Sequence, residues 1–156
     1  MIRMSILRAS VFGLMLNIAC TASVLAQSQE SQEENVIHVD IDGLHSDRGQ
    51  VLCALFSSAA DFPKKRDNAV ARARSEISGK HAICEFQNVS PGTYAVSVFH
   101  DENSNGRLDT NFMGIPREGV GASNDARGRF GPPKFSAAAF QHASGRTNLK
   151  ISINYL

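Results

Sequence analysis

Oxygen-bearing side chains recur at alternate positions in the segment HDENSNGRLDTN, residues 100–111. Such alternation, with a glycine that permits a sharp bend, lets a chain wrap around a hard cation such as Ca²⁺. The residues that fit the calcium-loop pattern are Asp101, Asn103, Asn105, Gly106, Arg107 through its carbonyl, and Asp109. All these ligands are hard oxygens, so calcium fits better than zinc. Because the segment supplies only two certain carboxylates, we expect weak binding of about 10⁻⁴ to 10⁻³ M.

The segment lacks the carboxylate that completes a full EF-hand. That position holds Phe112, and neither flank has the pattern of a helix. The chain is therefore no EF-hand, and the missing carboxylate must come from elsewhere. Glu118 is our first choice, and Asp125 is the other local candidate. The competing interpretation is that Asp, Asn, Ser and Gly simply form hydrogen-bonded turns.

His100 and Asp101 are neighbours, and Ser123 follows in the same loop-rich segment, which raises the alternative of a hydrolase. Nothing places Ser123 on a nucleophile elbow, and adjacency in sequence is not a hydrogen-bonded triad. The sequence therefore favours no catalytic residue. If a triad existed, the three side chains would have to converge within hydrogen-bond reach.

The N-terminal residues have the pattern of a secretory signal peptide. Arg3 and Arg8 precede an apolar run over residues 11–19, and small residues follow. We expect cleavage after Ala26, so residues 1–26 would be removed. The run is too short to span a membrane, so no transmembrane segment is expected after cleavage. A lipoprotein acylated at Cys20 is the alternative, but Asn17 occupies a position where a branched apolar residue is expected.

The expected mature chain is weakly acidic. Cleavage removes two of the 16 basic residues and none of the 15 acidic ones, leaving 14 against 15 and a net charge of −1. This charge gives no electrostatic reason to expect a nucleic-acid partner. Residues 27–35 are polar and acidic, which predicts a disordered leader. The remainder, residues 36–156, has the size of one domain.

Cleavage after Ala26 would leave two cysteines, Cys53 and Cys84. An even pair in an oxidising compartment predicts a disulfide between them. The alternative is a pair of buried thiols. The two are not a CxxC pair, so redox catalysis is not expected.

Alternating or continuous apolar runs predict strands at residues 37–41, 51–56, 82–86, 93–100 and 149–155. We expect the third and fourth of these to form a hairpin, and residues 69–73 to form a short helix. Residues 101–133 have no sustained periodicity and predict one long loop. The fold class that follows is all-β: an antiparallel Greek-key sandwich, immunoglobulin-like or prealbumin-like, with at most one or two short helices.

The segment PGTYAVSVFHDENSNGRLDTNFMGIPREGVGASN, followed by FGPPKF, resembles the bacterial domain-of-unknown-function family numbered 2141. The resemblance extends from about Val36 to the C-terminus. It implies a small secreted or periplasmic protein, and the family has no established activity to carry over. The PGTYAVSVFHDENSNG part is also similar to transthyretin-like and carboxypeptidase-regulatory-like sandwiches, but such a fold does not specify a function.

Three functional hypotheses follow from the sequence. The first is a non-enzymatic β-sandwich of the periplasm or cell exterior, stabilised by calcium at the Asp101–Asp109 loop. The second is an envelope module that binds a carbohydrate or peptide through the loops around Gly114–Asn124 and through exposed sheet surface. The third is the hydrolase that would use His100, Asp101 and Ser123. The sequence names neither the small ligand nor the envelope partner.

Overall fold

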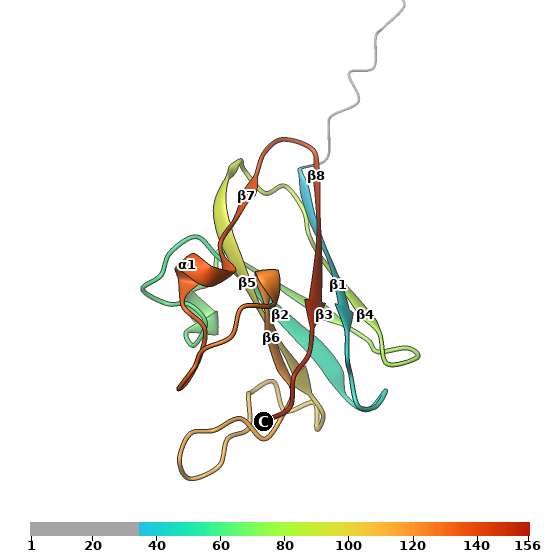
Figure 1. Ribbon diagram of the computed structural model, residues 1–156. Coiled ribbons are helices and arrows are strands. Elements are labelled where there is room, and N and C mark those ends of the chain that lie inside the picture. Colours follow the sequence, from blue (N-terminus) through green and yellow to red (C-terminus); the bar gives the residue numbers. More distant parts are fainter. Residues whose placement is uncertain (1–34) are drawn as a thin grey trace, which may run out of the picture. The chain divides into compact units, whose positions relative to one another are not determined.

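The structure is a computed structural model that describes residues 35–156, and in this part of the chain nearly all regular structure is β (Figure 1). The predicted signal peptide, Cys20 and all of the predicted leader except Asn35 lie outside the described residues. The strands are β1 (Val36–Asp42), β2 (Gln50–Phe56), β3 (Ala71–Ser75), β4 (Ala82–Phe86), β5 (Gly92–Asp101), β6 (Val120–Ala122), β7 (Phe140–His142) and β8 (Arg146–Ser152). One short helix, α1 (Phe135–Ala138), and two 3-10 turns, η1 (Arg66–Asn68) and η2 (Ser123–Asp125), complete the elements.

The strands form two sheets, as the predicted sandwich requires. One sheet has the order β4-β1-β8, and the other has the order β3-β2-β5-β6 with β7 also paired to β5. Ile37, Val39 and Ile41 of β1 are buried and alternate with more exposed polar residues. Together with apolar side chains from β2, β4, β5 and β8, they form the main core.

One strand pair differs from the antiparallel expectation: β8 runs parallel to β1. The chain leaves β7 in one sheet and enters the other at Gly145, whose carbonyl accepts the N–H of Val36 at 3.1 Å. Strand β8 therefore starts beside the start of β1 and runs in the same direction. The other pairs between named strands are antiparallel.

The expected hairpin and the expected helix at residues 69–73 are both wrong. Strands β4 and β5 follow each other in sequence but lie in different sheets, because β4 pairs with β1 and β5 pairs with β2. Residues 71–75 form β3 on the edge of β2. There Ala71 and Ala73 are half-buried while Arg72 and Arg74 are exposed. Pairing with β2 outweighs the helix preference of alanine and arginine.

Two further features position the loops. The sulfurs of Cys53 in β2 and Cys84 in β4 lie at bonding distance, with Cα atoms 6.6 Å apart, so the expected disulfide joins the two sheets. The outer face of β2 and β5 is covered by chain segments around Phe62 and Phe135, which form a second small apolar cluster with Phe56. None of the helices in residues 35–156 is long and apolar enough to cross a membrane.

Candidate functional site

Asp101 anchors the predicted metal loop at the end of β5. Its side chain is fully buried, and its carboxylate accepts the backbone N–H groups of Asn105 at 3.0 Å and Gly106 at 2.8 Å. A third hydrogen bond, of 2.7 Å, comes from the side-chain amide of Gln50. Gln50 stands opposite Asp101 in the β2–β5 register. The carboxylate thus holds the turn together and ties it to the neighbouring strand.

Glu118 lies at the same loop, although it is 17 residues further along the chain. It is 5 % exposed, and its carboxylate accepts the N–H groups of Glu102 and Asp109, each at 2.9 Å. One side chain therefore bridges the two ends of the segment. The other candidate for the missing carboxylate, Asp125, accepts the N–H of Ser152 at 2.9 Å and belongs to a different contact.

The amide side chains between these anchors turn toward Asp109. Nδ2 of Asn103 donates to its carboxylate at 2.7 Å, and Nδ2 of Asn105 does so at 3.2 Å. The Oδ1 atom of Asn105 accepts the N–H of Arg107 at 2.8 Å. Ser104 and Gly106 have φ angles of 58° and 78°, which produce the bends. The predicted ligand residues are thus close together, and their hydrogen bonds also fit the competing interpretation of a polar turn.

The predicted ligand set contains three carboxylates, Asp101, Asp109 and Glu118, and the loop also carries the charged residues Glu102 and Arg107. Within the described part of the chain, no Lys, Arg or His forms an ion pair with any of the three carboxylates. Buried charges are ordinarily paired or bound to a metal. In residues 35–156 no three His, Cys, Asp or Glu side chains are grouped as a metal cage by themselves. The predicted calcium-loop pattern does not consist of such side chains alone, because it also uses amide and main-chain oxygens as ligands.

The hypothetical catalytic triad is not assembled. The Nε2–H of His100 donates to the carbonyl of Arg48 at 2.7 Å, so Nδ1 is left to accept the hydroxyl of Tyr155 at 2.6 Å. Ser123 is also fully buried, and its Oγ accepts the N–H of Val96 and donates to the carbonyl of Ala138. Four residues of strand, about 13 Å, separate Val96 from His100. The side chains of His100 and Ser123 are therefore too far apart to act together, and their hydrogen bonds support the fold.

Tyr155 closes the end of the sandwich next to His100. Its hydroxyl also accepts the N–H of His45 at 3.0 Å, and the imidazole of His45 stacks on its ring with centroids 3.4 Å apart. Burial raises the pKa of Tyr155 above its ordinary value, although the hydrogen bond from His45 partly opposes this. The phenol therefore stays protonated and available as a donor to His100 at neutral pH.

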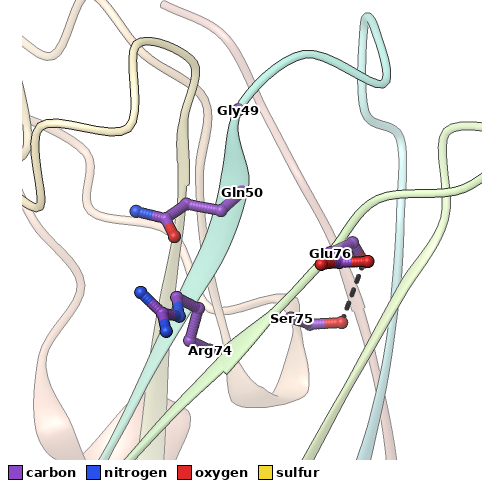
Figure 2. A pocket seen from close by; sticks show the side chains of 5 residues that line it. All are labelled: Gly49, Gln50, Arg74, Ser75 and Glu76. Carbon is purple, nitrogen blue, oxygen red and sulfur yellow. Dashed lines mark hydrogen bonds between the residues drawn. The ribbon is translucent and has the colours of Figure 1, made fainter.

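Sequence reasoning missed two features beside the loop. The first is a polar hollow lined by Gly49, Gln50, Arg74, Ser75 and Glu76, which Figure 2 shows between the start of β2 and the end of β3. It adjoins the loop, because Gln50 also binds Asp101. The strand register that brings these residues together has no local signal in the sequence.

The second missed feature is a small hairpin over residues 108–117. Thr110 pairs with Pro116, and the N–H of Arg117 donates to the carbonyl of Asp109 at 2.8 Å. Its tip carries Phe112 and Met113, which are 96 % and 64 % exposed. Two adjacent large apolar residues in an otherwise polar loop were a signal for an exposed contact.

The suspected segment Gly114–Asn124 is divided between two roles. Its first residues belong to the hairpin, whereas Glu118, Gly119, Ala122 and Ser123 are buried. A Cβ atom on Gly119 would approach the side chains of Ile153 and Tyr155 to within 2.4–2.6 Å. Most of the second half therefore packs against the sheet and presents little surface to a ligand.

Comparison with known proteins gives one match. The family model described as "Uncharacterized protein conserved in bacteria (DUF2141)" matches residues 39–150. No curated protein matches the chain. No solved structure matches it either.

Proposed function

Since the chain belongs to DUF2141, an uncharacterised family of bacterial proteins, its function must be inferred from its own site, and we propose a calcium-ordered, non-enzymatic β-sandwich of the periplasm or cell exterior. The metal would stabilise the loop and take part in no reaction. The proposed ligands are Asp101, Asn103, Asn105, the carbonyl of Arg107, Asp109 and Glu118.

The observation that carries the proposal is the position of Glu118. The loop pattern ends without its last carboxylate, and Glu118 brings a buried carboxylate to both ends of that loop. With Asp101 and Asp109 it gives the proposed ligand set three carboxylates, none of which forms an ion pair within residues 35–156. A bound cation would offset their mutual repulsion.

Calcium would act by restricting the loop. Ordering the backbone of each residue costs about 1–2 kcal/mol of conformational entropy, and ligand bonds across residues 101–118 would offset part of that cost. Glu118 connects the loop to the base of the hairpin over residues 108–117. Metal binding would therefore stabilise both segments together.

Isothermal titration calorimetry with calcium chloride tests the proposal. We expect saturable binding with a Kd of about 10⁻⁴ to 10⁻³ M. Asp109→Asn should weaken it at least about tenfold, because a charged ligand is lost. Asp125→Asn is the matched control and should bind like the wild type, since Asp125 contacts β8 instead. Absence of saturable heat at about 10 mM calcium would contradict the proposal.

The proposed location is supported by the sequence of residues 1–26 and by the disulfide, which is typical of oxidising compartments. We expect the exported chain to begin after Ala26. Mass spectrometry of the exported protein distinguishes this N-terminus from an acylated Cys20.

The second candidate function is an envelope module that binds a carbohydrate or a peptide. The polar hollow at Gln50 and Arg74 favours it, because an amide and a guanidinium suit hydroxyl or carboxylate groups of a ligand. This location differs from the Gly114–Asn124 segment suggested by the sequence. A glycan array tests it, and Arg74→Ala should abolish any specific signal.

A further inference from the structure

The hairpin over residues 108–117 is held in a defined shape by its own backbone. The N–H of Asn111 donates to the carbonyl of Ile115 at 2.8 Å, and the N–H of Gly114 donates to the carbonyl of Asn111 at 2.9 Å. The side chain of Asn111 accepts the N–H groups of Met113 and Ile115 at 2.9 and 3.0 Å. Gly114 has a φ angle of 77°, which closes the turn. The tip is therefore a turn whose backbone conformation is defined by its own hydrogen bonds.

This hairpin exposes apolar side chains that the rest of the described chain leaves uncovered. Phe112 is 96 % exposed and Met113 is 64 % exposed, and Ile115 and Leu108 are 40 % and 38 % exposed. In Figure 1 the segment extends beyond the sheets at the end of the molecule where the C-terminus lies. Removing such apolar side chains from water is favourable. Their clustering on one tip indicates a contact surface.

Two exposed positive charges flank this tip. Arg107 and Arg117 flank the apolar residues and are exposed, and in residues 35–156 neither forms an ion pair. The nearby carboxylate of Glu118 is buried and Asp109 is half-buried, and both carboxylates accept hydrogen bonds from the loop. The hairpin thus presents an apolar tip with guanidinium groups on its flanks. Guanidinium groups pair well with phosphate oxygens.

We propose that this hairpin docks on an anionic phospholipid bilayer, with Phe112 and Met113 in the boundary between headgroups and acyl chains and Arg107 and Arg117 on lipid phosphates. A stable protein interface involves about 20–30 residues on each partner, more than the hairpin over residues 108–117 contains. A bilayer accepts such a tip without a complementary groove, and its strength of binding combines apolar burial with electrostatic attraction. The contact does not require the calcium proposed for the adjacent loop.

A second exposed aromatic, Phe130, provides a contrast. It is 95 % exposed, but the guanidinium of Arg129 lies over its ring at 5.7 Å from the centroid. It therefore already has a partner within its own segment. Phe112 and Met113, in contrast, share their hairpin with two further exposed apolar residues, Leu108 and Ile115.

Vesicle co-sedimentation in chelator tests the inference without interference from calcium bridging. The protein is purified as the expressing bacterium processes it, with its N-terminus read by mass spectrometry, so that all variants share the same leader. We expect it to sediment with vesicles containing equal parts phosphatidylglycerol and phosphatidylcholine, and to sediment less with pure phosphatidylcholine. Phe112→Ser with Met113→Ser should weaken binding at least about tenfold. Arg107→Gln with Arg117→Gln should weaken binding to the anionic vesicles only.

Ile83→Ser is the matched control, because Ile83 is 45 % exposed on β4, away from the hairpin, and its loss should leave binding unchanged. Thermal melting verifies that each variant folds. Vesicle binding by the Phe112/Met113 variant that equals the wild type would overturn the inference. So would a wild-type chain that ignores anionic vesicles but forms a dimer which the same variant dissociates, since the tip would then be a contact between copies.

Discussion

At the scale of single residues, a few neighbouring polar side chains bear on both the catalytic and the metal-binding hypotheses. His100 and Ser123 have their hydrogen-bonding capacity taken up by backbone groups and by Tyr155, which leaves no free nucleophile or base in this pair. Asp101 and Glu118 are equally buried but bear charge and lack an ion pair in the described chain. His100 and Ser123 therefore support the fold, and the two carboxylates are the candidates for binding a cation.

Ser123→Ala tests the structural role of this hydroxyl. The change leaves the N–H of Val96 and the carbonyl of Ala138 without their partner in a fully buried position. We expect the free energy of unfolding to fall by about 1–3 kcal/mol. Urea unfolding measures it, and Ser136→Ala, at an exposed position in α1, is the control that should cost little. An unchanged urea midpoint for Ser123→Ala would contradict the assignment.

At the scale of elements, alternation in the sequence predicted β1, β2, β4, β5 and most of β8 within a few residues, because each buries one or both faces. It failed for β3, where small alanines alternate with arginines and imitate a helix. The predicted hairpin of β4 and β5 was also wrong, because each strand pairs with a strand that is distant in the sequence, and local residues do not reveal such a partner. At the site, spacing predicted the loop and Glu118 as its neighbour, whereas Gln50 required the strand register.

The sheet β4-β1-β8 also carries a pH-dependent contact on its exposed face. Glu85 accepts a hydrogen bond from His38 at 2.9 Å and another from Arg146 at 2.9 Å. These contacts, that of His38 first, hold the pKa of Glu85 below its ordinary 4.5. A lowered pKa in the folded state means that the contribution is present above about pH 4.5 and is lost as the pH falls through the folded-state pKa.

Glu85→Gln should therefore reduce the loss of stability in acid. We expect the urea midpoint of the wild type to fall more steeply than that of the variant between about pH 5 and about pH 3. The effect is small, because the carboxylate is exposed to solvent and screened. Parallel pH profiles for the two proteins would show that the contact contributes nothing.

At the scale of the whole molecule, two sheets enclose the main core and carry both the Asp101–Asp109 loop and the hairpin over residues 108–117. The disulfide between β2 and β4 is the one covalent side-chain cross-link between the sheets in residues 35–156. It closes a loop with a sequence separation of 31 residues. Such a link restricts the unfolded chain, and disulfides in general form and persist in oxidising compartments.

Removal of this link has a measurable cost. Cys53→Ala with Cys84→Ala should lower the free energy of unfolding by about 3–4 kcal/mol on the chain-entropy model. Chemical unfolding measures the change. Reductant should lower the stability of the wild type and leave the double variant unaffected. Two reactive thiols in the denatured, unreduced wild type would show that the link does not form.

Thermal melting of Glu118→Gln in calcium and in chelator tests the central claim most directly. Calcium at about ten times its Kd should stabilise the wild type by about 1.4 kcal/mol, which raises Tm by about 3–8 °C. Glu118→Gln should lose this increase, while Asp125→Asn should keep it. The account would be contradicted if calcium left the wild-type Tm unchanged, or if Glu118→Gln lowered Tm equally in both media.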